Sequence, residues 1–273
     1  MKLNTYQKVA LIFYVILVIY WIFIFLSGFK SSGHNYAFSF LFGLIPLIGG
    51  VIAIFNAKNW GGIKSSMGKV VLFIGLGVFL WGYGEMIWSF YNIFLHTPAP
   101  YPSLADLGFA PSIFFYGLGA AYLSMASGAK FGLRNTSAKV FVTLAPIIIL
   151  IFSYYILVIV ARGGVLLPPG ESPVKAVLDI AYPLGDFLSL TIAVIISGLS
   201  FKYLGGRFKI DIYAILLGLA VMFIGDSSFS YTTTVGTYYN ANWGDLLLMS
   251  GTFLLTFGVL GFTRSKNEVV KAE

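Results

Sequence analysis

The sequence has no cysteine and few charged residues, and both shortages narrow its class. Without cysteine, the 273-residue chain cannot form a disulfide, a thiolate metal site or a cysteine nucleophile. Charged residues make up only 10% of the chain, whereas a soluble domain carries about 25%. Because so few charges cannot coat a water-facing surface, and because 58% of the residues are hydrophobic, the composition predicts an integral membrane protein.

Several functional motifs are also missing. There is no Gly-x-Ser-x-Gly and no phosphate-binding loop with Gly-Lys-Ser/Thr, and no apolar run holds a central Lys for a retinal Schiff base. The two histidines, His34 and His96, are far apart and lack the spacing of zinc ligands. We therefore predict no metal and no cofactor, although the oxygens of the acidic residues would suit Ca²⁺ or Mg²⁺.

Eight apolar stretches are long enough to cross a membrane, for which about 20 residues are needed. The sequence thus predicts an all-α integral membrane protein, an eight-helix transmembrane bundle built from four helical hairpins. This domain covers 1–263, and a short basic cytoplasmic tail covers 264–273. The predicted spans are 9–29, 37–55, 70–94, 104–127, 140–161, 174–201, 210–235 and 243–262.

The Lys and Arg residues are concentrated in alternate connections between these spans. One side of the membrane receives 14 of the 17, and the other receives Lys30, Arg162 and Lys175. The positive-inside rule then places both termini in the cytoplasm of a multi-pass protein in the cell (plasma) membrane, with the lipid bilayer as its first partner. The net charge of +7 is therefore a topology signal, and no nucleic-acid partner is predicted, since that would require positive charges on one folded face.

The acidic residues follow the opposite pattern, because most fall on the outer side or in the outer part of a span. An ionisable group inside a span costs about 2.5–3.5 kcal/mol, so it is usually paired or solvated and often marks a functional site. The sequence predicts an outward-facing acidic and aromatic ligand-binding pocket. Its candidate residues are Glu85, Trp88, Tyr91, Asp106, Asp186, Asp226, Tyr231 and Asp245.

Two alternatives to a pocket stay open. The acids inside the spans, Glu85 and Asp226, could simply bond to neighbouring helices and fix their packing. Asp106, Asp186 and Asp245 each follow a turn-forming segment, so they could instead cap the first turns of helices.

Part of the chain repeats. The segment 84–91 and the segment 225–231 both read Gly, an acid, two residues, an aromatic residue, Ser and later Tyr. Each is followed by a loop and by a span that opens near Asp106 or Asp245. The third and fourth spans therefore resemble the seventh and eighth. The similarity could come from an internal duplication or could have arisen by chance.

The segment 100–109, Pro-Tyr-Pro-Ser-Leu-Ala-Asp-Leu-Gly-Phe, resembles the multi-helix membrane sensory modules found N-terminal to prokaryotic diguanylate cyclases and histidine kinases. Those modules also carry a Tyr-Pro-Leu-x-Asp helix, similar to 182–186 here, an acid in the penultimate helix and a Gly-Asp-Leu start to the last. The resemblance covers about 81–262 and implies a sensory module, of a kind whose ligands are mostly unknown. Because the chain ends eleven residues after Phe262, we expect a free-standing module that signals through a membrane or signalling partner protein.

The leading hypothesis is thus a sensor-like or ligand-binding membrane protein without catalysis, its ligand a small molecule or a lipid. One alternative is an intramembrane lipid hydrolase, because the chain is similar to the lysoplasmalogenase family in the placement of Glu85 and Asp226. That family's helix-borne His and Lys-Pro features are missing here. Another alternative is a small-molecule transporter built on the hairpin repeat. Transporter sites usually lie at the midplane of the membrane, whereas the acids of this chain lie outward of it.

Overall fold

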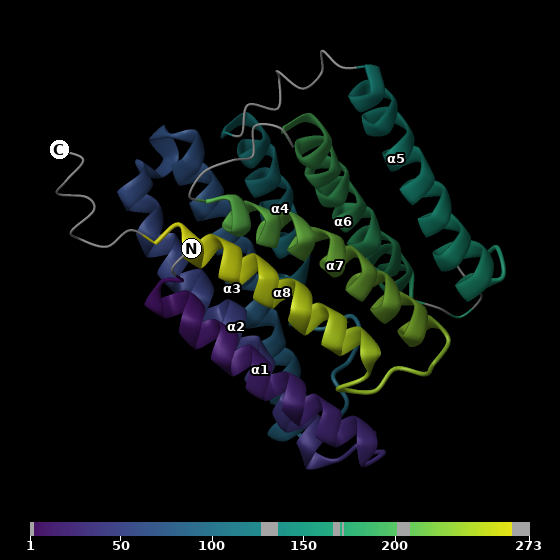
Figure 1. Ribbon diagram of the computed structural model, residues 1–273. Coiled ribbons are helices and arrows are strands. Elements are labelled where there is room, and N and C mark those ends of the chain that lie inside the picture. The colour runs from purple at the N-terminus through teal and green to yellow at the C-terminus, as the bar shows by residue number, and fades with distance from the viewer. Residues whose placement is uncertain (1–2, 127–135, 166–169, 171, 201–207, 264–273) are drawn as a thin grey trace.

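A computed structural model describes residues 3–126, 136–165, 170, 172–200 and 208–263 (Figure 1). Over these residues the chain forms eight α-helices, with two short 3₁₀ turns before α3 and a π-helical turn at Tyr155–Val160 after α5. The helices are α1 Thr5–Leu26, α2 Gly33–Asn56, α3 Ser66–Ile93, α4 Asp106–Ala126, α5 Thr136–Tyr154, α6 Pro173–Ser200, α7 Lys209–Thr234 and α8 Trp243–Gly261.

Six of the helices, α1, α2, α3, α4, α7 and α8, are long and apolar enough to cross a membrane. The predicted all-helical fold is confirmed for the described residues, and these six helices are compatible with the predicted membrane spans. The spans at α5 and α6 and the cytoplasmic position of the termini stay predictions. The predicted tail, 264–273, lies outside the described residues, as do the basic loops at 127–135 and 201–207.

Six helices form a closed ring in which each packs against the next. Their order is α2, α3, α4, α6, α7 and α8, and α8 returns to α2. The other two lie outside the ring: α1 packs against α2 and α8, and α5 packs against α6, where Figure 1 shows it at the edge of the bundle. Only four residues of α1 are buried although nearly all of it is apolar, as is typical of a helix that faces lipid.

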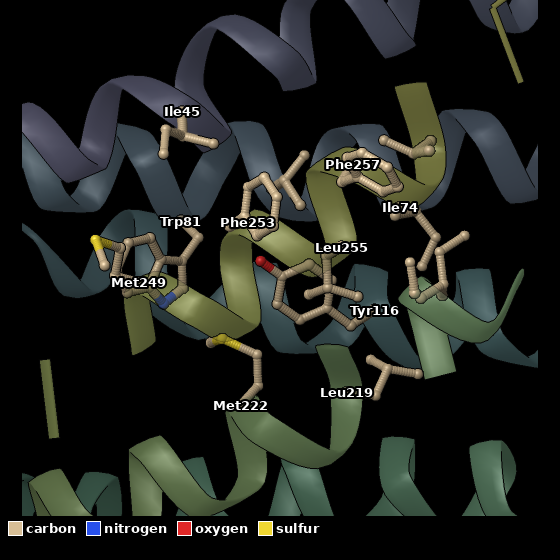
Figure 2. Close-up of a cluster of buried hydrophobic side chains, with 14 of the residues drawn as sticks. Ile45, Ile74, Trp81, Tyr116, Leu219, Met222, Met249, Phe253, Leu255 and Phe257 are labelled. Atoms are coloured by element: carbon tan, nitrogen blue, oxygen red, sulfur yellow. The ribbon is translucent and has the colours of Figure 1, made fainter. Parts of the chain in front are cut away.

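The core of the ring is a continuous hydrophobic cluster (Figure 2). The cluster includes Trp81 and Ile74 from α3, Met222 from α7 and Met249 from α8, and all four are at least 96% buried. Glycine lets α3 and α4 approach closely: a Cβ added at Gly108 would lie 2.4 Å from a backbone carbonyl oxygen of α3. Small residues at such contacts are typical of closely packed membrane helices.

Polar groups fasten the end of the bundle that holds both termini. The Asn4 side chain donates to the carbonyl of Leu260 at 2.7 Å, and Gln7 Nε2 donates to the Asp211 carboxylate at 2.7 Å. These bonds join the start of α1 to the start of α7 and the end of α8, which lie side by side (Figure 1). We call this the terminal end, and the end with the α1–α2, α3–α4 and α7–α8 connections the loop end.

Candidate functional site

A cavity of about 40 Å³ lies inside the ring toward the loop end. This is room for a few water-sized groups, since one water needs about 10–15 Å³. Side chains from α3, α4, α6, α7 and α8 and from two loops line it. We call it the acidic chamber, and its lining is Trp81, Glu85, Trp88, Tyr101, Asp106, Phe109, Ile113, Tyr182, Asp226, Phe229, Tyr238, Asp245 and Leu248.

Glu85, in the last third of α3, is the least satisfied acid of the chamber. Its side chain is 6% exposed and faces the cavity. No group in the described part of the chain donates a hydrogen bond to its carboxyl. The charged group that acts on it electrostatically is another acid, Asp245. A buried carboxyl in such surroundings has neither a counter-charge nor a donor from the protein.

Asp245 lies in the first turn of α8 and is held by backbone geometry. The Asn242 side chain caps α8 by accepting from the backbone N–H of Asp245 at 3.0 Å. The Asp245 carboxylate in turn accepts from the backbone N–H of Ala241 at 2.6 Å and from the Tyr238 hydroxyl at 3.3 Å. An acid here also suits the positive end of the helix dipole. One side of the carboxylate is thus fixed while the side chain still lines the chamber.

Asp106 occupies the equivalent place at the start of α4. Its carboxylate accepts from the backbone N–H of Ser103 at 2.7 Å and from the hydroxyl of Tyr182. The second bond connects α4 to its ring neighbour α6. Helix-end bonding, one of the two alternatives drawn from the sequence, therefore holds for Asp106 and Asp245, and both also line the chamber.

Asp226 and Asp186 bring two carboxyl groups together. Asp226, on α7, lines the chamber, and Asp186, on α6, lies next to it without lining the cavity. Asp186 is 1% exposed, and its Oδ2 has no hydrogen-bond partner within the described structure. Because α6 begins at Pro173, Asp186 lies in the middle of a helix, and the prediction that it caps a helix start is wrong.

Four aromatic rings cover the chamber on its loop side, and we call them the aromatic layer. Phe229 is at the centre, with ring centroids 5.9 Å from Trp88, 5.6 Å from Tyr101 and 5.0 Å from Tyr238, all edge to face. Trp88 is held in place by a bond from its Nε1 to Asn240 at 3.0 Å. Such edge-to-face contacts favour a fixed arrangement of the four rings.

Beyond the aromatic layer lies a second, larger cavity of about 390 Å³, which we call the loop cavity. Trp88, Tyr101 and Tyr238 line both cavities, so the layer is the partition between them. Among the described residues, the lining of the loop cavity includes Lys30 and Lys175 and no acid, whereas that of the chamber includes four acids and no base. The described linings of the two cavities therefore differ in the kind of ionisable group that they carry.

The tyrosines of the partition keep their protons. Burial raises the pKa of Tyr238 well above its usual value, and the nearby negative charges of Asp245 and Glu85 raise it further. Burial likewise raises the pKa of Tyr101, with a further contribution from Asp179. Both hydroxyls therefore remain neutral hydrogen-bond donors at physiological pH.

Asp179, on α6 near the loop end, is an acid whose charge is balanced by basic side chains. It forms a buried ion pair with Arg162 at 2.5 Å and accepts from Lys175 at 3.2 Å. It does not line the chamber. Arg162 and Lys175 thus meet an acid outside the chamber, and neither lines the chamber.

The structure brings five of the eight candidate residues to one cavity: Glu85, Trp88, Asp106, Asp226 and Asp245. Asp186 lies behind Asp226. Tyr91 and Tyr231 are half-buried, and neither lines the chamber or the loop cavity.

The sequence analysis did not single out the three chamber tyrosines, Tyr101, Tyr182 and Tyr238. Two of them precede a proline, in Tyr101-Pro and Tyr182-Pro, inside segments that were noticed for their Asp. The Tyr-Pro dipeptide in each of these segments could have identified the two tyrosines.

The carboxyl groups line the chamber at separate points. No three His, Asp or Glu side chains of the described residues are arranged so that they could hold one metal ion. In the comparisons with known proteins, no protein-family model, no curated protein and no solved structure matches this chain.

Proposed function

We propose that this chain is a polytopic plasma-membrane protein, with both termini cytoplasmic, that binds a small-molecule or lipid ligand in the acidic chamber at its outer end. The observation that carries the proposal is the state of Glu85. It is buried, it lines a cavity with three other acids, and no described protein group bonds to its carboxyl. A buried polar group without a partner is unfavourable, so a bound ligand is the natural source of the missing contacts.

The same protein shows what a structural acid looks like. Asp211 at the terminal end is as buried as Glu85, at 4% against 6% exposed. It accepts from Gln7 at 2.7 Å and packs tightly against Gly261. An acid that only joins helices is thus bonded and enclosed, whereas Glu85 faces open space.

A sensor-like role fits this arrangement. The motifs that resemble membrane sensory modules, 100–109, 182–186 and 244–246, all contribute to the chamber or its rim. Ligand binding between α3, α4, α6, α7 and α8 would act on five helices at once, and their far ends could present the change to a membrane or signalling partner protein. This role requires no catalysis.

A lipid hydrolase is the second candidate, and the neighbouring carboxyls of Asp186 and Asp226 favour it. Two adjacent carboxyls can share a proton and serve as general acid and base. The hydrolase predicts turnover of a lysolipid that stops in Asp226→Asn. A transporter is less favoured, because the packed core around Met222 and Met249 separates the chamber from the terminal end.

The binding proposal is tested by thermal unfolding of the protein in phospholipid nanodiscs, with a panel of cationic, neutral and anionic small molecules and single-chain amphiphiles. We expect at least one member to raise the unfolding midpoint of the wild type. The same member should leave Glu85→Gln unchanged and should still stabilise the matched control Asp211→Asn. A panel in which no compound stabilises the wild type, or in which Glu85→Gln responds fully, would contradict the proposal.

A further inference from the structure

We infer that the ligand is a single-chain amphiphile with a cationic ammonium head, which lies in the acidic chamber while its tail occupies an apolar groove between α4 and α6. The inference rests on the proposed binding function and names the chemical class of the ligand. Three observations support it: the groove, the chemistry of the chamber and the difference between the two ways into it.

The groove is a cavity of about 510 Å³ between α4 and α6, lined almost entirely by apolar side chains. At its rim, Phe114 is 63% and Leu188 is 56% exposed, so the groove opens on the lipid-facing surface of the bundle. Ile113 and Tyr182 line both the groove and the chamber. The Tyr182 hydroxyl bonds to Asp106 in the chamber, so this side chain and Ile113 form the wall between the two spaces, and an amphiphile that occupies both must displace the Tyr182 ring.

The chamber is suited to a cation. Its lining has four carboxyl groups and no basic side chain, and Glu85 lacks any partner from the described protein. Much of the remaining wall is aromatic and includes Trp81, Trp88 and Phe229. Carboxylates with aromatic rings are the usual recognition site for an ammonium group, through charge-assisted hydrogen bonds and cation–π contact. An anionic head would be repelled, and a neutral head would leave Glu85 without a counter-charge.

The two ways into the chamber differ, and the difference favours entry from the bilayer. The loop cavity carries Lys30 and Lys175, and the aromatic layer separates it from the chamber. A cation approaching from that side meets like charge. The groove carries no charged side chain. A ligand that arrives along the groove needs an apolar chain, and the small volume of the chamber limits its head to about the size of an ammonium group.

The test measures binding of four compounds to the protein in zwitterionic phospholipid nanodiscs by titration calorimetry, with empty nanodiscs as the blank. Dodecylamine carries both proposed features, because an alkylammonium stays protonated at pH 7 as lysine does. Dodecanol lacks the charge, dodecanoate reverses it, and butylamine lacks the long tail. We expect dodecylamine to bind at least about tenfold tighter than each of the other three, a difference of about 1.4 kcal/mol.

Two variants test where the head and the tail of the ligand bind. Glu85→Gln should weaken dodecylamine about tenfold and leave dodecanol unchanged. Gly117→Phe should fill the groove, because a Cβ at Gly117 meets only the Ser189 hydroxyl, at 3.6 Å. It should bring dodecylamine to the affinity of butylamine. The matched control is Leu107→Phe, which places a ring on the lipid-exposed surface of the same helix, outside the groove.

Each outcome decides a separate part. If dodecanol or dodecanoate binds as tightly as dodecylamine, the cationic head is refuted while the binding function stands. If butylamine binds the wild type as tightly as dodecylamine does, binding of the tail in the groove is refuted. This result does not depend on whether Gly117→Phe folds. If none of the four binds, the inference is overturned, and the wider panel of the binding test decides the proposed function independently.

Discussion

Replacing Glu85 with glutamine should stabilise the ligand-free protein. The Glu85 carboxyl is 6% exposed and receives no hydrogen bond from the described residues, and leaving a buried polar group in that state costs about 1–3 kcal/mol. Glutamine has nearly the same shape but no charge and is less costly to bury. We expect the free energy of unfolding to rise by about 1 kcal/mol, which raises the unfolding midpoint by about 2–4 °C in a chain of this size.

The matched comparison is Asp211→Asn, which removes the same charge at the other end of the bundle. Asp211 accepts a hydrogen bond from Gln7, and a bond to a charged acceptor is worth about 1 kcal/mol more than a neutral one. This variant should therefore unfold at a lower temperature than the wild type. The assay is thermal unfolding in nanodiscs without added amphiphile, followed by tryptophan fluorescence. A loss of stability in Glu85→Gln as large as that in Asp211→Asn would refute the reasoning and make Glu85 a packing residue.

Three further predictions test the packing, the partition and the topology. Gly108→Ala should destabilise the protein by at least about 1–3 kcal/mol, measured by thermal unfolding, because the new Cβ would lie 2.4 Å from a backbone oxygen. The pKa values of Tyr101 and Tyr238 are raised in the folded protein, so both side chains favour the folded state while they are neutral. The free energy of unfolding should therefore be constant up to about pH 10 and fall above it, more steeply than in the variant with Phe at both positions. In this cysteine-free chain, a membrane-impermeant maleimide should label Ser31→Cys from outside the cell and Ser65→Cys only in inverted vesicles.

The positions of the helices were largely predictable from hydropathy, because a membrane span must be a long apolar run. The predicted span 210–235 corresponds to α7 and 243–262 to α8, each within one residue. The starts of α1, α2 and α3 were placed four residues too late. Those helices begin at polar caps, Asn4, Ser32 and Ser65, which hydropathy assigns to the loops.

The residues of the site were predictable in part. An acid inside a span is unfavourable enough to attract notice, and Glu85 and Asp226 were identified on that ground. Whether such acids meet depends on which helices are neighbours, and that is a property of the whole packing. The tyrosines were missed because an aromatic residue in an apolar run is ordinary, and only the position of Tyr182 opposite Asp106 gives its hydroxyl a role.

The position of α5 explains both the chamber and the groove. If the helices packed around the ring in chain order, α5 would separate α4 from α6. Instead α5 packs on the outside of α6, and α4 and α6 are direct neighbours. Only this arrangement allows Tyr182 to reach Asp106 and places Ile113 between the acidic chamber and the lipid-facing groove. Because α5 lies outside the ring, the acidic chamber and the groove are neighbours that share two wall residues, which is the arrangement that the proposed amphiphilic ligand requires.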